Sequence, residues 1–139
     1  MQSEMKPTWG MANRRLSTYG LLVIFSLVII FHLLVLTGVV PFKIVWGGRL
    51  ENHSQMVAFE IVSIALNLLM LMVVLVDGSI MKVNVKGKLL KISLWFMFGL
   101  FLLNTVGNLF SNNETERMIF TPLTLLLSLL SLHLAVTRK

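Results

Sequence analysis

The segment Met56-Val-Ala-Phe-Glu-Ile-Val-Ser-Ile-Ala-Leu-Asn-Leu-Leu-Met-Leu-Met-Val-Val-Leu-Val76 decides the fold of this chain. It is an apolar run of about 21 residues, and roughly 20 residues of helix cross the hydrocarbon core of a bilayer. Three further apolar runs lie at 19–40, 89–110 and 119–136. Only helices and closed barrels span membranes, and these runs lack the alternation of barrel strands. The sequence therefore predicts an all-α bundle of four transmembrane helices.

The composition leaves no room for a second, soluble domain. The chain has 139 residues, of which 13% are charged, whereas a soluble domain averages roughly 25%. We expect a basic cytoplasmic tail at 1–17 and one four-helix domain at 18–137, with helices at about 18–40, 54–77, 89–110 and 114–137. An outer interfacial segment at 41–53 and a basic inner connection at 78–88 join them. The first run is too long for the core of a cleavable signal peptide.

The positive charges indicate the orientation of the helices. All but three of the 12 Lys and Arg residues lie in the amino-terminal tail, between the second and third runs, or at the carboxyl terminus. The exceptions are Lys43, Arg49 and Arg117. Cytoplasmic loops are enriched in Lys and Arg, so both termini are expected in the cytoplasm. The net charge of +6 then reflects topology and attraction to anionic lipid headgroups, and we expect no nucleic-acid partner. The expected location is a bacterial inner (plasma) membrane, with several passes.

Glu60 stands inside the second apolar run, where a charged side chain costs about 2.5–3.5 kcal/mol on insertion scales. It shares one helical face with Ser63 and Asn67, which lie three and seven residues further on. An ionisable residue inside a membrane is by default a candidate functional residue. The alternative is a structural role, in which Glu60 pairs with Arg49 or hydrogen-bonds to His32 and holds the outer end of the bundle together.

Polar residues on two other helices fall at a similar depth. At 1.5 Å per residue, Glu60 lies roughly 6–9 Å below the outer boundary, Asn104 roughly 9 Å and His32 roughly 12 Å. Asn108 shares the face of Asn104, and the segment 41–50 should place Trp46 and Arg49 at the outer mouth. The sequence therefore predicts a polar pocket in the outer half of the bundle, closed below by Leu, Met and Phe. The predicted ligand-binding residues are Glu60, His32, Asn67, Asn104, Asn108, Trp46 and Arg49.

Each of these polar groups also has a structural interpretation. Asn104 and Asn108 could hydrogen-bond between helices, and His32 alone is more often a satisfied core histidine than a ligand. On the fourth helix, small polar residues recur at three- and four-residue spacing and are typical of a packing seam, because small side chains let membrane helices approach closely. The same seam, through Thr124, Ser128 and Ser131, could instead bind a second copy or another membrane protein.

Several classes of chemistry find no support in the sequence. It has no motif for phosphate cradling, dinucleotide binding or a nucleophile elbow. The absence of cysteine excludes disulfides and thiolate metal sites. His32, His53 and Glu60 make at most a loose set of metal ligands, so we expect no metal and no cofactor. A carboxylate with a histidine can act as an acid/base pair, so an intramembrane enzyme stays a hypothesis, without an assigned catalytic residue.

The run Pro41-Phe-Lys-Ile-Val-Trp-Gly-Gly-Arg-Leu50, followed by Glu60, Asn67 and Asn104-Thr-Val-Gly-Asn108, resembles a group of small four-helix bacterial membrane proteins of unassigned function. The resemblance covers about 18–136 and implies no activity, cofactor or site. Small drug exporters share the length and helix count. They carry a carboxylate in the first helix and have little charge bias, and this chain has neither property.

Three hypotheses about function follow from the sequence. The first is a protein that binds or transports a small amphipathic ligand or a lipid in the outer pocket. The second is a non-catalytic accessory subunit of a larger membrane complex, which would associate through the fourth helix. The third is an intramembrane enzyme with Glu60 and His32 as acid and base, which requires both side chains to converge on one cavity.

Overall fold

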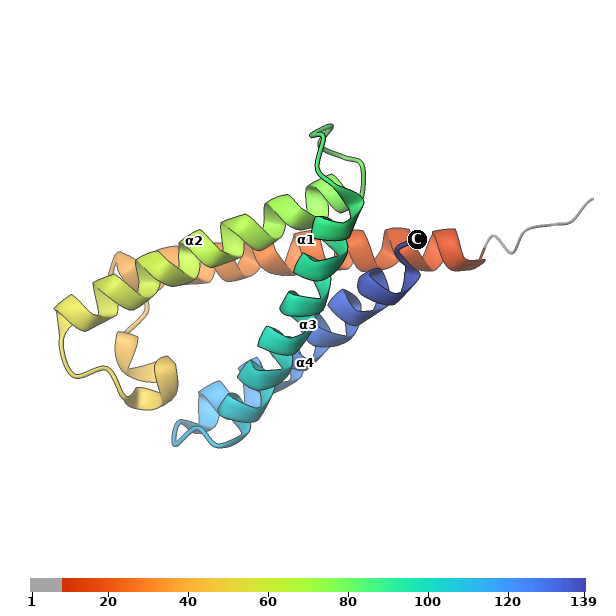
Figure 1. The fold of residues 1–139 in the computed structure, drawn as a ribbon. Coiled ribbons are helices and arrows are strands. Elements are labelled where there is room, and N and C mark those ends of the chain that lie inside the picture. Colours follow the sequence, from red (N-terminus) through yellow and green to blue (C-terminus); the bar gives the residue numbers. More distant parts are fainter. Residues whose placement is uncertain (1–8) are drawn as a thin grey trace, which may run out of the picture.

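The structure is a computed structural model that describes residues 9–139, and its regular elements in that range are helices (Figure 1). The helices are α1 (Trp9–Leu36), α2 (His53–Asp77), α3 (Gly87–Leu109) and α4 (Glu114–Thr137), with two short 3-10 turns, η1 (Phe42–Ile44) and η2 (Trp46–Gly48). By length and composition, four helices can cross a membrane. A span of 23–25 residues is about 35 Å long, against a hydrocarbon core of about 30 Å.

The first helix differs at both ends from the expected range of 18–40. It begins at Trp9, so the later part of the expected tail is helical, and the part before Trp9 lies outside the described residues. It ends at Leu36, before the expected stop at Pro41, because Gly38 has a φ of +80°. A glycine in the left-handed conformation terminates helices routinely. The remaining helices begin and end within about two residues of the sequence expectation.

Side-chain caps fix the starts of α2 and α4. Asn52 accepts a hydrogen bond from the backbone N–H of Gln55 at 2.9 Å, and the side chain of Gln55 accepts one from the N–H of Glu51. Asn113 accepts in the same way from the N–H of Glu116 at 3.1 Å. Each cap satisfies a backbone donor that the first helical turn leaves without an intrahelical partner. The residue types at these positions are those that favour a cap.

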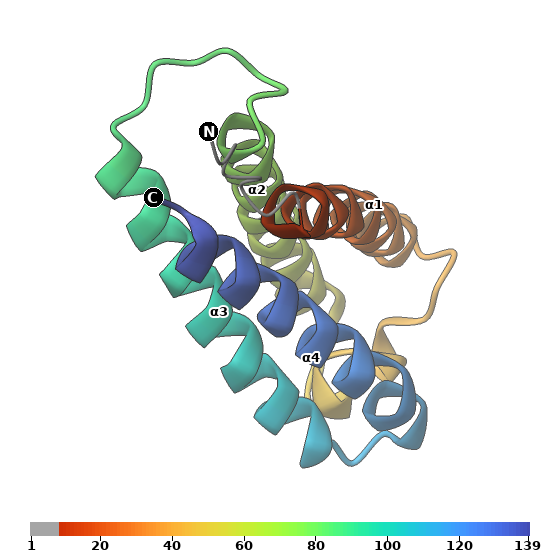
Figure 2. The same cartoon turned by 90° about the vertical axis from the view of Figure 1, so that its right-hand side faces the viewer.

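The four helices form two antiparallel pairs that meet at one end and diverge at the other (Figures 1 and 2). α1 packs on α2 and α3 packs on α4, while α1 against α4 joins the pairs and α2 touches α3 only slightly. The convergent end holds the start of α1, the end of α4 and the connection 78–86. The divergent end holds the two 3-10 turns and the 110–113 turn. The pocket lies at this divergent end.

Apolar packing and one buried charge cluster hold the convergent end together. A core of ten buried side chains from all four helices lies in this half of the molecule and includes Leu21, Phe25 and Leu94. Beyond it, the carboxylate of Asp77 forms ion pairs with Arg14 and Arg138 and has no exposed side-chain surface. These contacts join the end of α2 to the start of α1 and to the residue after α4.

The segment after α1 bridges the divergent end. Val45 is buried with Val35 and Met56 in a second, smaller apolar cluster. From this anchor the chain reaches both helix pairs: the indole N–H of Trp46 donates to Glu60 on α2, and the N–H of Gly47 donates to the Glu116 carboxylate on α4. The segment therefore folds into the opening between the pairs.

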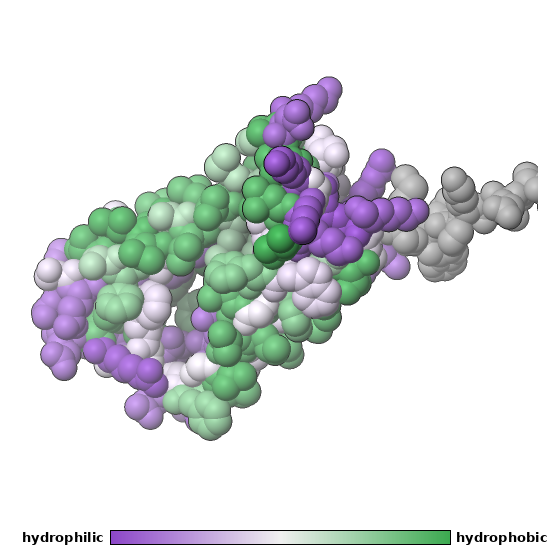
Figure 3. Space-filling model, in the orientation of Figure 1, coloured by the Kyte–Doolittle hydropathy of each residue, from purple (hydrophilic) through white to green (hydrophobic). Residues whose placement is uncertain are grey.

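The surface has hydrophilic residues at its two ends and a broad hydrophobic zone between them, and it is hollowed between α2 and the divergent end of α3 (Figure 3). Large apolar side chains such as Val23, Leu69 and Leu103 are more than half exposed along the helices. An outward-facing apolar surface of this extent suits a lipid environment.

Candidate functional site: a pocket between the helix pairs

A cavity of about 530 Å³ occupies the divergent end of the bundle. Side chains from all four helices and from residues 45–49 line it. The cavity exists because the two helix pairs separate toward this end until their side chains no longer fill the space between them. The bridging segment, which includes residues 45–49, covers only one end of the cavity. Its volume falls within the range of about 300–1,000 Å³ that is usual for small-molecule sites.

The lining changes from polar to apolar along the cavity. Polar groups lie toward the end near η2 and along one wall: His32, Asn67, Asn104, Asn108, Glu116 and Thr124. Arg49 also belongs to the lining. The inner end is closed by Met70, Leu100, Phe101 and Leu127. The expected closure by Leu, Met and Phe is therefore found. A ligand in this space would meet hydrogen-bonding groups at one end and hydrocarbon at the other.

The pocket opens sideways between α2 and α3. Leu66 on α2 and Leu103 on α3 both line the cavity and are 41% and 71% exposed. Leu66 lies about 20 Å along α2 from its start at His53, and Leu103 lies about 9 Å from the end of α3 at Leu109. If the helices span a bilayer, the gap lies at the depth of the lipid chains.

Glu60 points into the protein and is fully buried, as its position in an apolar run required. Its carboxylate is 2.6 Å from Nδ1 of His32 on α1 and accepts the indole N–H of Trp46 at 3.1 Å. Glu60 itself does not line the cavity. Whether it contacts a ligand stays a prediction. Its contacts match the structural alternative, with His32 rather than Arg49 as the partner.

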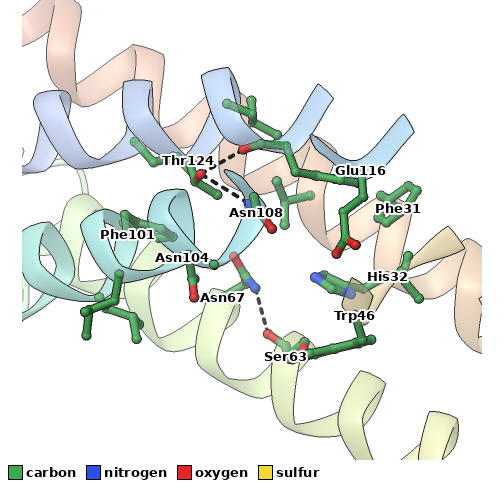
Figure 4. Close-up of a pocket in the computed structure, with 18 of the residues that line it drawn as sticks. Phe31, His32, Trp46, Ser63, Asn67, Phe101, Asn104, Asn108, Glu116 and Thr124 are labelled. Atoms are coloured by element: carbon green, nitrogen blue, oxygen red, sulfur yellow. Dashed lines mark hydrogen bonds between the residues drawn. The ribbon is translucent and has the colours of Figure 1, made fainter. Parts of the chain in front are cut away.

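The other predicted ligand-binding residues all line the one cavity: His32, Trp46, Arg49, Asn67, Asn104 and Asn108. Figure 4 shows the amides of Asn67, Asn104 and Asn108 directed into the same space from α2 and α3. The residues that the sequence puts at a similar depth therefore lie around one space. Whether they bind a ligand stays a prediction.

The three amides differ in how far the protein satisfies them. Asn67 donates to the carbonyl of Ser63 in its own helix at 2.8 Å, and Asn108 donates to Thr124 on α4 at 3.3 Å. Asn104 is exposed and makes no side-chain hydrogen bond within residues 9–139. Only Asn108 therefore joins two helices, and the structural interpretation does not extend to Asn104.

Sequence reasoning missed Glu116 as a pocket residue. The sequence indicates only that it belongs to a helix start, yet its side chain is 7% exposed and lines the cavity. Its Oε2 accepts the N–H of Gly47 and the hydroxyl of Ser111, each at 2.6 Å. The signal was the four-residue spacing of Glu116, Phe120 and Thr124, which extends the polar face of α4 by two turns to its outer end.

The 3-10 turn η2 within the bridging segment has a strained backbone conformation. Trp46, Gly47 and Gly48 have φ values of 57°, 67° and 69°. Glycine adopts these angles readily, but a residue with a side chain loses roughly 1–2 kcal/mol there. Trp46 is held by its hydrogen bond to Glu60 and by contact with Phe59, with ring centroids 4.9 Å apart. Glu60 therefore acts on the pocket indirectly, by positioning the tryptophan and histidine that line it.

The small-residue stripe of α4 is buried inside the chain. Ser128 and Ser131 are 1% and 0% exposed, and the Ser128 hydroxyl donates to the carbonyl of Phe98 on α3. Thr124 hydrogen-bonds to Thr105 and Asn108 on α3. These contacts are those of an internal packing seam. Association with a partner through Thr124, Ser128 and Ser131 stays a prediction.

Metal and acid/base chemistry both need side chains that converge on one space. Within residues 9–139, no group of three His, Asp or Glu side chains is placed to hold a metal ion. The enzyme hypothesis required Glu60 and His32 to converge on a cavity, and only His32 reaches it. A pocket with an amphipathic lining and a lateral opening is suited to holding a molecule.

Comparison with known proteins gives no independent assignment: the chain matches no family model, no curated protein and no solved structure.

Proposed function

We propose that this chain is an integral membrane protein that binds or transports a small amphipathic molecule or a lipid in the pocket between its helix pairs. The supporting observation is the cavity of about 530 Å³, which is polar at its outer end, apolar at its inner end and open between α2 and α3. A molecule with a polar head and a hydrocarbon tail matches this order of surfaces.

The lateral opening supports a route from the bilayer. A lipid-like ligand would enter between Leu66 and Leu103 with its tail still in hydrocarbon, so the tail would never cross water. Its head would move past Asn104 and Asn67, whose amides replace part of the hydration lost on entry. Because an uncompensated polar group in an apolar medium costs several kcal/mol, polar groups along the path lower the barrier to entry.

The orientation belongs to the same proposal. The convergent end carries most of the positive charge, including Lys82, Lys86 and Lys88, so the positive-inside rule puts it in the cytoplasm with both termini. The pocket end then faces outward. The location that fits is a bacterial inner membrane. In this cysteine-free chain, a single cysteine at Asn112 should react with an impermeant maleimide in intact cells, whereas one at Lys82 should react only after permeabilisation. The reverse pattern would overturn the orientation.

Photolabelling tests the pocket itself. The protein is placed in vesicles of phosphatidylethanolamine and phosphatidylglycerol that contain a trace of phosphatidylethanolamine with a diazirine in its acyl chain. After irradiation, peptide mass spectrometry maps the adducts. Binding in the pocket predicts adducts concentrated at Leu66, Leu103 and the neighbouring residues of the gap. Adducts spread evenly over the outer faces of all four helices would refute the proposal.

Two glycines on α3 supply a matched pair of variants. Gly107 lines the cavity, Gly99 does not, and a Cβ at either position meets no atom within 4 Å. Gly107→Phe should therefore fill the pocket without disturbing the fold and should remove the concentrated labelling. Gly99→Phe should leave the labelling as in the wild type. Equal labelling of the two variants would show that the lipid contacts only the outside.

A further inference from the structure

Three acidic side chains are buried in the part of the chain that the structure describes, and two of them have basic partners. Asp77 pairs with two arginines, and Glu60 pairs with a histidine. Glu116 is 7% exposed, yet within residues 9–139 no lysine, arginine or histidine forms an ion pair with it. Burying a carboxylate without a compensating charge is expensive, so Glu116 is distinct from the others.

The contacts of Glu116 use only one of its two oxygens. Oε2 accepts both hydrogen bonds, from Gly47 and Ser111, while Oε1 has no hydrogen-bond partner within residues 9–139. The side chain lines the cavity, and Figure 4 shows its carboxylate directed into it, beside the ring of His32. The amino-terminal dipole of α4 stabilises part of the negative charge.

We propose that the ligand of this pocket carries a protonated primary or secondary amine, and that Glu116 binds that ammonium group. This inference rests on the amphiphile site proposed above and names the chemistry of the head. An ammonium group would donate a hydrogen bond to Oε1 and supply the missing charge in a site of low dielectric constant, where such bonds are strong. A divalent metal ion would need further ligands that the cavity does not assemble within the described residues.

Arg49 also lines the cavity and carries a like charge, but it forms no ion pair with Glu116 within residues 9–139. Several of the remaining groups suit an ammonium head. The rings of Phe31, Trp46 and Phe120 line it, and an organic cation is attracted to aromatic faces at close range. The amide of Asn108 uses its N–H to reach Thr124, and its carbonyl oxygen has no partner within the part of the chain that the structure describes. It therefore remains available as a second acceptor for an ammonium N–H.

The position of Glu116 fixes how the ligand would lie. The residue is in the first turn of α4, about 3 Å along the helix axis from its outer start, so the head would sit near the level of the lipid headgroups. The apolar inner end and the gap between Leu66 and Leu103 lie deeper. The tail would run down the cavity and out toward the bilayer.

Competition for the pocket tests the inference. Protein in nonionic maltoside micelles is photolabelled with the diazirine lipid, and dodecylamine, dodecanol and dodecanoate are added as competitors. An alkylamine, like the lysine side chain, is protonated at neutral pH. Dodecylamine should displace the label from the wild type at a concentration roughly tenfold or more below that of dodecanol, as hydrogen bonds to charged groups imply. Dodecanoate should compete least.

Two isosteric variants test whether Glu116 causes the advantage of dodecylamine over dodecanol. Glu116→Gln keeps an oxygen acceptor for Gly47 and Ser111 but removes the charge, so the advantage of dodecylamine over dodecanol should disappear. Glu114→Gln removes an exposed acid from the same helical turn and should preserve the advantage, which controls for the helix dipole and for nonspecific adsorption of amines.

The outcomes separate this inference from the pocket proposal. If dodecanol competes as well as dodecylamine in the wild type, Glu116 gives an ammonium group no advantage and the amine inference is wrong, while the pocket survives. That comparison needs no variant, so it stands even if Glu116→Gln does not fold. If no competitor displaces the label and Gly107→Phe leaves it unchanged, the pocket proposal itself fails.

Discussion

Replacing Asp77 with asparagine should destabilise the convergent end of the bundle strongly. The Asp77 carboxylate has no exposed surface and pairs with Arg14 from α1 and Arg138 beyond α4. Asparagine has the same shape but only one acceptor oxygen. Its amide N–H group would face the second guanidinium, so one charge-assisted hydrogen bond is lost and a donor–donor contact replaces it.

The size of the effect follows from the exposure of the partners. Removing one member of a fully buried ion pair costs about 3–5 kcal/mol. The side chains of Arg14 and Arg138 remain 23% and 19% exposed, so both can recover part of their hydration. Arg14 also keeps its hydrogen bonds to the Leu134 carbonyl and the Thr137 hydroxyl. The expected loss in the free energy of unfolding is therefore about 2–3 kcal/mol.

Equilibrium unfolding in mixed nonionic and dodecyl sulfate micelles, followed by circular dichroism, measures this loss. Glu51→Gln is the control, because Glu51 is exposed and forms no ion pair within residues 9–139, and its effect should stay within about 0.5 kcal/mol. Arg138→Gln should cost less in the Asp77→Asn background than in the wild type. If Asp77→Asn stays within about 0.5 kcal/mol of the wild type, or if the two changes are additive, the cluster does not stabilise the bundle.

Further substitutions give sharper local tests in the same unfolding assay. Gly78→Ala should destabilise by about 1–3 kcal/mol, because its Cβ would lie 2.7 Å from the methyl of Thr18; Gly99→Ala, with no atom within 4 Å, should be neutral or stabilising, and equal effects would contradict the close contact. Asn52→Ala should cost about 1 kcal/mol through the lost cap, and no loss would show that this cap is replaceable. Glu60→Leu should cost roughly 2–6 kcal/mol, since two ring nitrogens lose their partner at about 1–3 kcal/mol each; a stable variant would remove the positioning role of Glu60.

The candidate site was only partly predictable from the sequence. Depth and helical face can be counted along a chain, so the residue positions alone were enough to group His32, Asn67, Asn104 and Asn108. Residue positions do not show which side chain pairs with each buried charge. Glu60 lies on the expected face, but its carboxylate accepts the indole N–H of Trp46 from the bridging segment and does not line the cavity.

For Glu116, the sequence predicted the local role but not the place in the pocket. Its position in a first helical turn predicted a role at the helix start, which depends only on neighbours in sequence. Its place in the pocket depends on the angle between the helix pairs, because only their divergence opens a cavity beside it. Local periodicity could have suggested the face, but not that the face borders empty space.

The amino-acid sequence by itself determined that this chain forms four apolar helices of membrane-spanning length, since apolarity and segment length are properties of each run alone. It also determined the caps at Asn52 and Asn113, which use residues three positions away. Only the tertiary structure decided that the pairs diverge, that the segment after α1 bridges them, and that a carboxylate from α4 has no basic partner within residues 9–139. These features depend on contacts between residues far apart in the chain, whose geometry no single segment specifies.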